Sequence, residues 1–447
     1  MTTASGRIVH VLEHLVKVVP VGTNRALLQL MWAVVSGAFL HSRGAVHSAL
    51  KQAGFAPEEI RRSWQALRYG VWSSDELLLR WRSWVKAETG WQPNQYDGWQ
   101  PLAIDITGFW RPRLQGWVGR CYHQLARRLL PSVSFAVVVQ VGQVGAQRLP
   151  LLRQLLRGGN EVETEAALKQ KMLSWACFHL GHREVLVCDA GVKLKQMQTA
   201  DVARFVLRLA RNCTARRNWL PPQSGRGRPR QYGRLVRPLA RTYKGRRLPA
   251  SIPDVRCDFR QDDVTITAHG WRHLVRSDQK ANQTHTTFTI WVYFDPRFQL
   301  PLVLATNLEA EAATVFRLYC DRWPVEQVPL VAKQLLGLQR HFVFAPASIW
   351  RLPELALLMG NILTVMATLL PPMPSGYWDR HPKKRPDACG VHWNRRLFQI
   401  LTPFRSEFGK KRHERTTYPR ESRRIGACRR SFQPTTASFE ANYGPHC

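Results

Sequence analysis

The sequence has few acidic residues for its length. Asp and Glu number 31 against 65 Lys and Arg in 447 residues, so the formal net charge is +34. This excess predicts a polyanionic partner, most simply nucleic acid, because cations that neutralise phosphates release condensed counterions. A basic membrane-surface protein would gather its charge on one amphipathic segment, and here the charge is spread along the whole chain.

The sequence also lacks paired cysteine motifs and long apolar runs. Its nine cysteines include no CxxC pair and no zinc-ligand spacing, which predicts reduced thiols in a cytoplasmic protein. The first apolar stretch contains Glu13 and Lys17 and makes a poor signal peptide. The longest apolar run, 355–370, has 16 residues and contains Asn361, so we expect a buried core helix and not a membrane span.

The amino-terminal segment has the apolar spacing of helices. Residues 1–95 show this spacing most clearly over 25–40 and 74–87. The intervening stretch, 43–70, predicts a helix, a glycine-containing turn and a second helix. We therefore expect a helical amino-terminal domain over 1–95.

Two interpretations of the 43–70 stretch remain open. Pro57 suits the first turn of the second helix. In a DNA-binding helix-turn-helix, Arg61, Arg62 and Arg68 would face DNA. In the commoner alternative, the stretch is an ordinary helical hairpin with a solvated basic face.

Strands and helices alternate after this domain, which predicts an α/β fold. The predicted strands are 101–105, 134–142 and 183–191, and the predicted helices are 161–180 and 199–211. Asp105 ends the first strand, and Asp189 lies where the third gives way to a glycine turn. Functional groups tend to collect at such strand ends in α/β sheets.

The middle of the chain changes in composition. Residues 211–247 hold twelve Arg or Lys and no Asp or Glu, which predicts either a flexible DNA-gripping arm or a solubilising loop. Residues 262–306 have the β-branched, turn-bounded pattern of strands. Asn307 is expected to cap the next helix, with Glu309 and Glu311 in its first turn.

The stretch YCDRWPVEQVPLVAK (319–333) places charged and phenolic side chains at regular offsets. On an ideal helix Tyr319, Arg322, Glu326 and Lys333 fall within a stripe about 60° wide. Pro324 interrupts this helix and either kinks it or begins a new one. The stripe is either a solvated face with loose ion pairs or a carboxylate flanked by phosphate-binding cations.

Asp105, Asp189 and Glu326 gain significance when they are considered together. Carboxylates at neighbouring strand ends repel one another unless a positive group lies between them. Hard oxygen ligands suit Mg²⁺ or Mn²⁺, and two such ions would activate an attacking oxygen and stabilise a leaving one. Each Asp taken alone is more often a turn or capping residue.

With these residues in place, the chain resembles bacterial insertion-sequence transposases of the DDE class. The resemblance covers roughly 95–370 and rests on the signature Y-x2-R-x3-E-x6-K, met by Tyr319, Arg322, Glu326 and Lys333. The LAIDIT and VLVCDAG stretches match the two Asp motifs, at Asp105 and Asp189. The resemblance implies an RNase H-like catalytic core interrupted by a β-rich insertion, with Asp105, Asp189 and Glu326 as catalytic metal ligands.

The resemblance also implies an activity and its partners. The expected reaction is cut-and-paste transposition of DNA: metal-dependent cleavage at the element ends, a hairpin intermediate, and strand transfer to target DNA, with two Mg²⁺ or Mn²⁺ ions per site. The expected partners are double-stranded DNA and a second copy of the chain when two ends are paired, in the bacterial cytoplasm near the nucleoid. The remaining alternatives are a decayed or domesticated copy that acts as a DNA-binding repressor, and an RNase H-like nuclease.

DNA contacts are expected from several side chains. By resemblance, Tyr319, Arg322 and Lys333 would grip phosphates near the cleaved bond, and an aromatic residue of the insertion would receive a flipped base. The basic and aromatic candidates of the insertion are Arg226, Arg228, Arg230, Trp271, Trp291 and Trp219. Each Trp has a commoner alternative role in core packing.

The domain organisation follows from these patterns. The expected segments are a helical DNA-binding domain (1–95), the first part of the core (96–210), the linker and insertion (211–306), the second part of the core (307–370) and a basic, weakly ordered tail (371–447).

Overall fold

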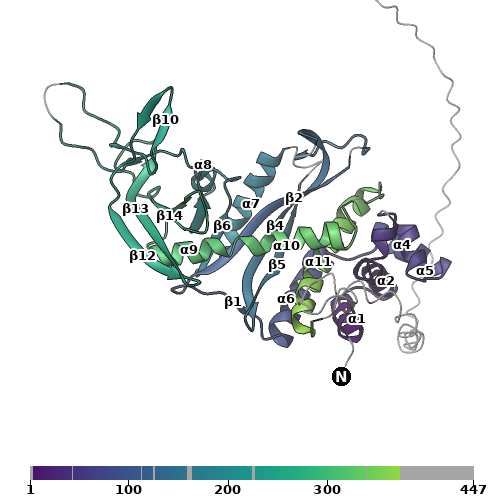
Figure 1. The fold of residues 1–447 in the computed structure, drawn as a ribbon. Helices are drawn as coiled ribbons and strands as arrows, with labels where there is room; N and C mark the ends of the chain where they lie inside the picture. Colours follow the sequence, from purple (N-terminus) through teal and green to yellow (C-terminus); the bar gives the residue numbers. More distant parts are fainter. Residues whose placement is uncertain are drawn as a thin grey trace, which may run out of the picture. The chain divides into compact units, whose positions relative to one another are not determined.

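The amino-terminal segment is helical, as its apolar spacing predicts. The computed structural model describes residues 4–42, 44–111, 113–123, 126–158, 164–223, 227–339 and 341–372. The helices are α1 (Ala4–Val16), α2 (Thr23–Val35), α3 (Ala38–His41), α4 (Val46–Gln52), α5 (Pro57–Tyr69) and α6 (Ser74–Glu88) (Figure 1). Pro57 opens α5 as expected. The stretch 25–40 is helical, and Gly37, with φ 74°, separates α2 from α3 within it.

A large mixed sheet forms the centre of the structure. Its strands follow the order β1-β4-β2-β6-β7-β15-β14-β13-β8-β9, with β3 and β5 paired to β4 and β12 paired to β13. The strands of its first part are β1 (Gln92–Pro93), β2 (Gln100–Trp110), β3 (Arg120–His123), β4 (Arg128–Val144), β5 (Gln147–Arg157), β6 (Glu184–Cys188) and β7 (Phe205–Arg208). This mixed α/β architecture confirms the predicted fold class at that level.

The connectivity of this first part combines antiparallel and parallel pairs. Strand β4 lies antiparallel to both β2 and β5, whereas β6 is parallel to β2 and β7 is parallel to β6. Helix α7 (Glu165–His179) precedes β6, and helix α8 (Leu194–Thr199) connects β6 to β7. Parallel neighbours need such crossover connections, because both strands run in the same direction.

Two local expectations in this region are wrong. The stretch 199–211 is not a helix: its FVLR segment forms β7, which pairs with β6 on one side and β15 on the other. Asn307 does not cap a helix, because its amide oxygen accepts the Phe205 backbone N–H at 3.0 Å and its amide nitrogen donates to the Ala203 carbonyl at 2.8 Å. Glu311 takes the capping position of the next helix.

The insertion is rich in strands, as predicted. Its strands are β8 (Ala215–Arg217), β9 (Leu235–Val236), β10 (Arg241–Tyr243), β11 (Arg246–Leu248), β12 (Val255–Gln261), β13 (Val264–Arg276), β14 (Phe288–Phe294) and β15 (Leu302–Thr306). Strands β10 and β11 form a separate two-stranded sheet, and the others join the main sheet.

Pro324 begins a new helical segment and does not bend a continuous one. Helix α9 (Ala312–Cys320) ends before it, and the 3-10 turn η1 (Trp323–Glu326) carries Pro324 in its first turn. Helix α10 (Gln327–Leu330) and the π-helical turn η2 (Val331–Leu335) continue the chain. A proline is tolerated at this position because its missing N–H would be unpaired there anyway.

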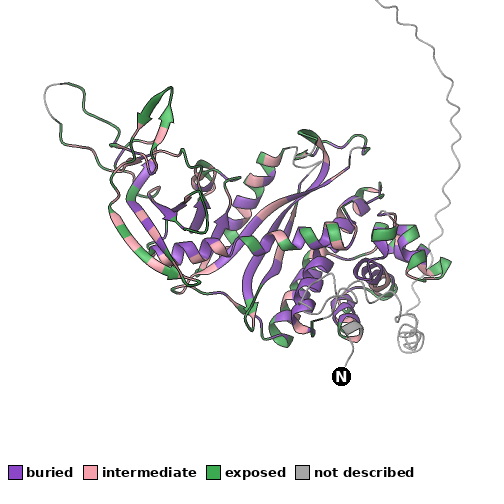
Figure 2. Cartoon of the chain, viewed as in Figure 1, coloured by how far each residue is buried: buried purple, intermediate pink, exposed green. Residues whose placement is uncertain are grey.

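Helix α11 (Pro346–Leu369) is a core helix, as the apolar run predicts. Its surface is almost wholly buried (Figure 2). Among the described residues it is the one helix long and apolar enough to cross a membrane, and 94% of its apolar window is buried inside the protein. Asn361 on α11 accepts the indole N–H of Trp81 at 2.8 Å and the Leu152 backbone N–H at 3.0 Å, which ties α11 to α6 and β5.

The described residues all fall within one compact unit, Met1–Phe398. The predicted basic tail lies outside the described residues from 373 onwards. The five-segment division of the chain therefore stays a prediction.

Candidate functional site

The two aspartates follow the end of the parallel pairing of β2 and β6. The paired residues run up to Ala103 beside Val187. Continuing this register by two residues brings Asp105 level with Asp189. Asp189 lies directly after β6, as predicted, whereas Asp105 lies inside β2, because this strand continues to Trp110 in its pairing with β4.

Arg322 lies between the second aspartate and the signature glutamate. Its guanidinium is 3% exposed, and its Nη1 is 2.8 Å from Glu326 Oε1. Arg322 also interacts electrostatically with Asp189 and with the Tyr319 phenol. On its other side Asp189 Oδ1 is 3.5 Å from Arg208 Nη1 and accepts the Ala190 backbone N–H at 2.7 Å. Arg322 thus links the carboxylates of two separate segments.

Asp105 and Lys333 are both partly buried and interact electrostatically with each other. Burial raises the pKa of Asp105 to about 6; the negative charge of Glu326 adds to this rise, and Arg322 and Lys333 oppose it. Burial lowers the pKa of Lys333 to about 8, although Asp105 opposes the change. The Lys333 ammonium lies 5.2 Å and 5.1 Å from the ring centres of Phe109 and Trp110, whose faces attract a cation.

A buried carboxylate fixes the chain immediately before Arg322. Asp321 is 0% exposed, and its Oδ2 accepts the Asn94 amide N–H at 2.7 Å and the Tyr96 hydroxyl at 3.1 Å. Its Oδ1 lies 2.9 Å from Arg148 Nε. These partners come from the segment before β2 and from the hairpin of β4 and β5, so the break between α9 and η1 is held against the sheet.

The site therefore gathers three carboxylates (Asp105, Asp189 and Glu326) and three cations (Arg208, Arg322 and Lys333). In the described ranges, no group of three or more His, Cys, Asp or Glu side chains lies close enough to hold a metal ion. Glu326 is turned toward Arg322 at 2.8 Å. The donor chemistry fits a hard divalent cation, because the three acidic side chains offer carboxylate oxygens, the ligands that Mg²⁺ and Mn²⁺ prefer.

The predicted phosphate-binding residues differ in their accessibility. Tyr319 is 5% exposed and Arg322 3% exposed, whereas Lys333 is half-buried. The Tyr319 phenol is hydrogen-bonded to Arg322. The predicted phosphate contact of Tyr319 stays a prediction.

The aromatic and basic candidates of the insertion separate into buried and exposed groups. Trp271 is 1% exposed, and its indole N–H donates to the Ile252 carbonyl at 3.0 Å, so no face of its ring is open to a base. Trp291 is also buried at 2%. Trp219 is 49% exposed, with the Arg217 guanidinium 5.0 Å from its ring centre.

The three arginines expected in the basic linker are only partly described. Arg228 and Arg230 are exposed, and Arg226 lies outside the described residues. Their predicted DNA contacts stay predictions.

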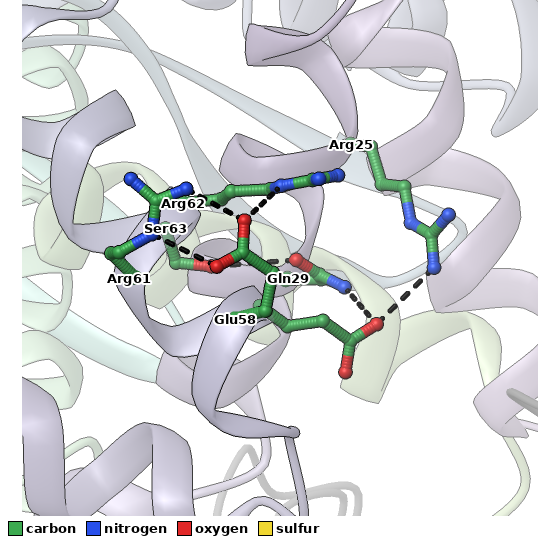
Figure 3. A network of polar contacts seen from close by, with 7 residues as sticks. Arg25, Gln29, Glu58, Arg61, Arg62 and Ser63 are labelled. Atoms are coloured by element: carbon green, nitrogen blue, oxygen red, sulfur yellow. Dashed lines mark hydrogen bonds and ion pairs between the residues drawn. The ribbon is translucent and has the colours of Figure 1, made fainter.

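The candidate helix-turn-helix has cations that are already paired. Glu58 accepts bonds from Arg61 Nη2 at 2.7 Å and from Arg62 Nε at 2.9 Å (Figure 3). Hydrogen bonds from Arg61 and then Arg62 lower the pKa of Glu58 to about 2. Arg68 lies 4.8 Å from the ring centre of Tyr69. Exposed ion pairs of this kind are weak and are compatible with both interpretations of 43–70, so both stay open.

Two residues of the site are absent from the sequence-based predictions. Trp323 is 58% exposed, and the Arg322 guanidinium lies 4.5 Å from its ring centre, so it offers an aromatic surface at the site. Its position beside Pro324 in the signature was a usable signal. Arg208 is not among the predicted site residues, because the sequence pattern predicts a helix over 199–211, whereas Arg208 is the last residue of strand β7.

Comparison with known proteins adds no assignment for this chain. No model of a known protein family matches the sequence, and no curated protein matches it either.

Proposed function

We propose that the chain is a DDE transposase that cleaves and joins DNA at the ends of an insertion sequence. The observation that carries the proposal is the convergence of Asp105, Asp189 and the signature residues of 319–333 in one site. These residues come from two neighbouring parallel strands and from a helical segment more than a hundred positions further along the chain.

The sheet supports the same proposal. Its first part has the strand order β5-β4-β2-β6-β7, with three strands in an antiparallel meander followed by two parallel strands. This arrangement is the one expected of an RNase H-like core. The β-rich segment between Asp189 and Glu326 corresponds to the expected insertion.

The site residues have distinct roles in this mechanism. Asp105, Asp189 and Glu326 would hold Mg²⁺ or Mn²⁺, which when bound supplies Lewis-acid stabilisation for displacement at phosphorus. Arg322 positions Glu326 and places a positive charge where phosphate charge develops. Lys333 adds a second positive charge beside Asp105, and its aromatic contacts limit its movement.

The DNA partner follows from the charge of the whole chain and from the exposed basic segments. A net charge of +34 favours phosphate binding of any sequence. Pairing two element ends requires two copies of the chain, and the expected location is the bacterial cytoplasm. The full pathway would include nicking, a hairpin at the excised end, and strand transfer.

Excision from a plasmid that carries the native element ends tests the proposal. Glu326→Gln should abolish excision in Mg²⁺ while binding to the ends is retained, because the substitution removes a charge and preserves the shape of the side chain. The matched control is Glu309→Gln, which removes an exposed carboxylate from the segment before α9 and should leave excision unchanged. Tight binding to the ends with no excision by the wild type would identify a protein that only binds DNA.

A further inference from the structure

The β10–β11 hairpin is the most basic folded element of the insertion. Residues 241–248 include Arg241, Lys244, Arg246 and Arg247 and no acid. The two strands pair only with each other, as a separate sheet that projects from the insertion (Figure 1). From Thr242 to Arg247 every residue is exposed (Figure 2).

The hairpin is a defined structure with a tight turn. Arg241 pairs with Leu248 and Tyr243 with Arg246, so only Lys244 and Gly245 form the loop. Both loop residues have positive φ, 48° and 75°, as a type I′ turn requires. Positive φ is unfavourable for a lysine, so the turn is held by the strands on either side of it.

The base of the hairpin is fixed to the rest of the protein. The Arg241 guanidinium donates to the Asn212 carbonyl at 2.6 Å. Arg237 and Ser251, which flank the hairpin, bond to each other twice: the Arg237 N–H donates to Ser251 Oγ at 2.9 Å, and the Ser251 N–H donates to the Arg237 carbonyl at 2.7 Å. A loop that served only solubility would not need such anchoring.

The cations of the hairpin differ from other arginines of the insertion in lacking acidic partners. Arg217 pairs with Asp254, and Arg276 pairs with Asp278. Throughout the described ranges no acidic side chain forms an ion pair with Lys244, Arg246 or Arg247. Lys244 Nζ instead lies 5.8 Å from the ring centre of Tyr243. Three neighbouring positive charges repel one another, and an anionic partner would remove this repulsion.

The geometry of the ribbon indicates the kind of anion. Successive side chains of a strand point to opposite faces, so Arg246 lies on one face with Tyr243, and Arg247 lies on the other with Thr242. A two-stranded β-ribbon fits the DNA major groove, which is about 12 Å wide. A ribbon in this groove would direct one arginine toward each of the two flanking phosphate backbones.

We propose that the β10–β11 hairpin enters a groove of double-stranded DNA and that Arg246 and Arg247 contact opposite phosphate backbones. The identity of the partner rests on the proposed function. The hairpin adds a second DNA-binding element to that function, because it would contact the duplex at a place distinct from the segment that carries Glu326.

The test measures duplex affinity of the full-length protein over a range of salt concentrations. The variant is Arg246→Gln with Arg247→Gln. The matched control is Arg256→Gln with Arg260→Gln, which removes the same charge from the exposed positions of strand β12 in the same insertion. Thermal unfolding of each variant checks that the fold is retained.

Loss of two phosphate contacts should lower the slope of log affinity against log salt by about 2, and weaken binding roughly 60-fold at about 100 mM salt. The control should keep the wild-type slope. Arg246→Lys with Arg247→Lys should restore most of the affinity, because lysine also binds phosphate as a point charge.

Several outcomes would overturn the inference. Wild-type affinity in the glutamine variant, equal losses in the variant and the control, or no duplex binding by the wild type would each contradict it. An equal loss on single-stranded DNA would contradict groove entry. Loss of binding in the hairpin variant, together with no excision by the wild type, would support the hairpin contact and refute the transposase.

Discussion

Asp105 carries a cost in stability that its removal should relieve. Burial raises its pKa from the usual 3.8 to about 6. The folded protein therefore holds the Asp105 proton more tightly than the unfolded chain does. This group favours folding most below the unfolded pKa, and its contribution falls as the pH rises through the window between 3.8 and about 6. Above that window, the difference between the folded and unfolded pKa of Asp105 lowers the free energy of unfolding by about 3 kcal/mol.

Asp105→Asn should consequently stabilise the protein when divalent metal is removed by a chelator. The asparagine keeps an acceptor for the Ile106 backbone and carries no charge. The gain should approach about 3 kcal/mol near pH 7.5 and shrink to about 1 kcal/mol near pH 4.5, because the free-energy difference accumulates as the pH rises from the unfolded pKa of 3.8 to the folded pKa of about 6. Urea unfolding followed by tryptophan fluorescence measures both values by linear extrapolation.

Asp295→Asn is the matched control, and its effect on the free energy of unfolding should have the opposite sign. Asp295 is 7% exposed, and bonds from Arg297 lower its pKa. Its ionised form therefore stabilises the fold above the unfolded pKa, and this stabilisation is lost as the pH falls through the folded pKa. The control should destabilise the protein near pH 7.5.

Added Mn²⁺ should raise the urea midpoint of unfolding of the wild type and leave that of Asp105→Asn unchanged. Destabilisation by Asp105→Asn in chelator would refute the reasoning.

The remaining predictions concern the core and the tail. Asn361→Leu should lower the free energy of unfolding by about 3 kcal/mol or more, because it leaves the buried N–H groups of Trp81 and Leu152 without an acceptor. The control Thr364→Val removes only a hydrogen bond within α11 and should change the free energy of unfolding by less than about 1 kcal/mol. Equal losses of this free energy in the two variants, measured by urea unfolding, would contradict the prediction. Deletion of 373–447 should leave metal-dependent nicking of a plasmid intact, because α11 completes the described core before it; loss of nicking would assign the tail to the catalytic machinery.

Local patterns in the sequence predict much of the fold around the site. The turn-bounded apolar run before Asp189 is a strand, and Pro324 starts a new helical turn, which is one of the two outcomes that its chemistry allows. The stripe of charged residues was derived for one ideal helix, whereas the chain passes through 3-10, α and π segments. The prediction of a shared position still succeeded for Arg322 and Glu326, because four residues span about one turn in each of these forms.

The failures arise where distant partners decide the structure. Residues 205–208 satisfy both helical and strand patterns, and only the adjacent edge of β6 selects a strand. Asn307 was a good capping residue by its local sequence, but the open backbone groups of Ala203 and Phe205 compete for its amide. The burial of Trp271 follows from the assembled sheet, and no pattern in its neighbours separates a packed indole from an exposed one.

Helix α11 has a consequence for how genes of this kind can evolve. It packs against α2, α5 and α6 on the amino-terminal side and against β5, α10 and η2, the last two from the part of the chain that follows Glu326. Recombination that exchanged the first 95 codons for those of a distant relative would pair this helix with surfaces it was not selected to fit. The amino-terminal helices and the segment 319–335 should therefore be inherited together, and changes in either should arise by substitution in place.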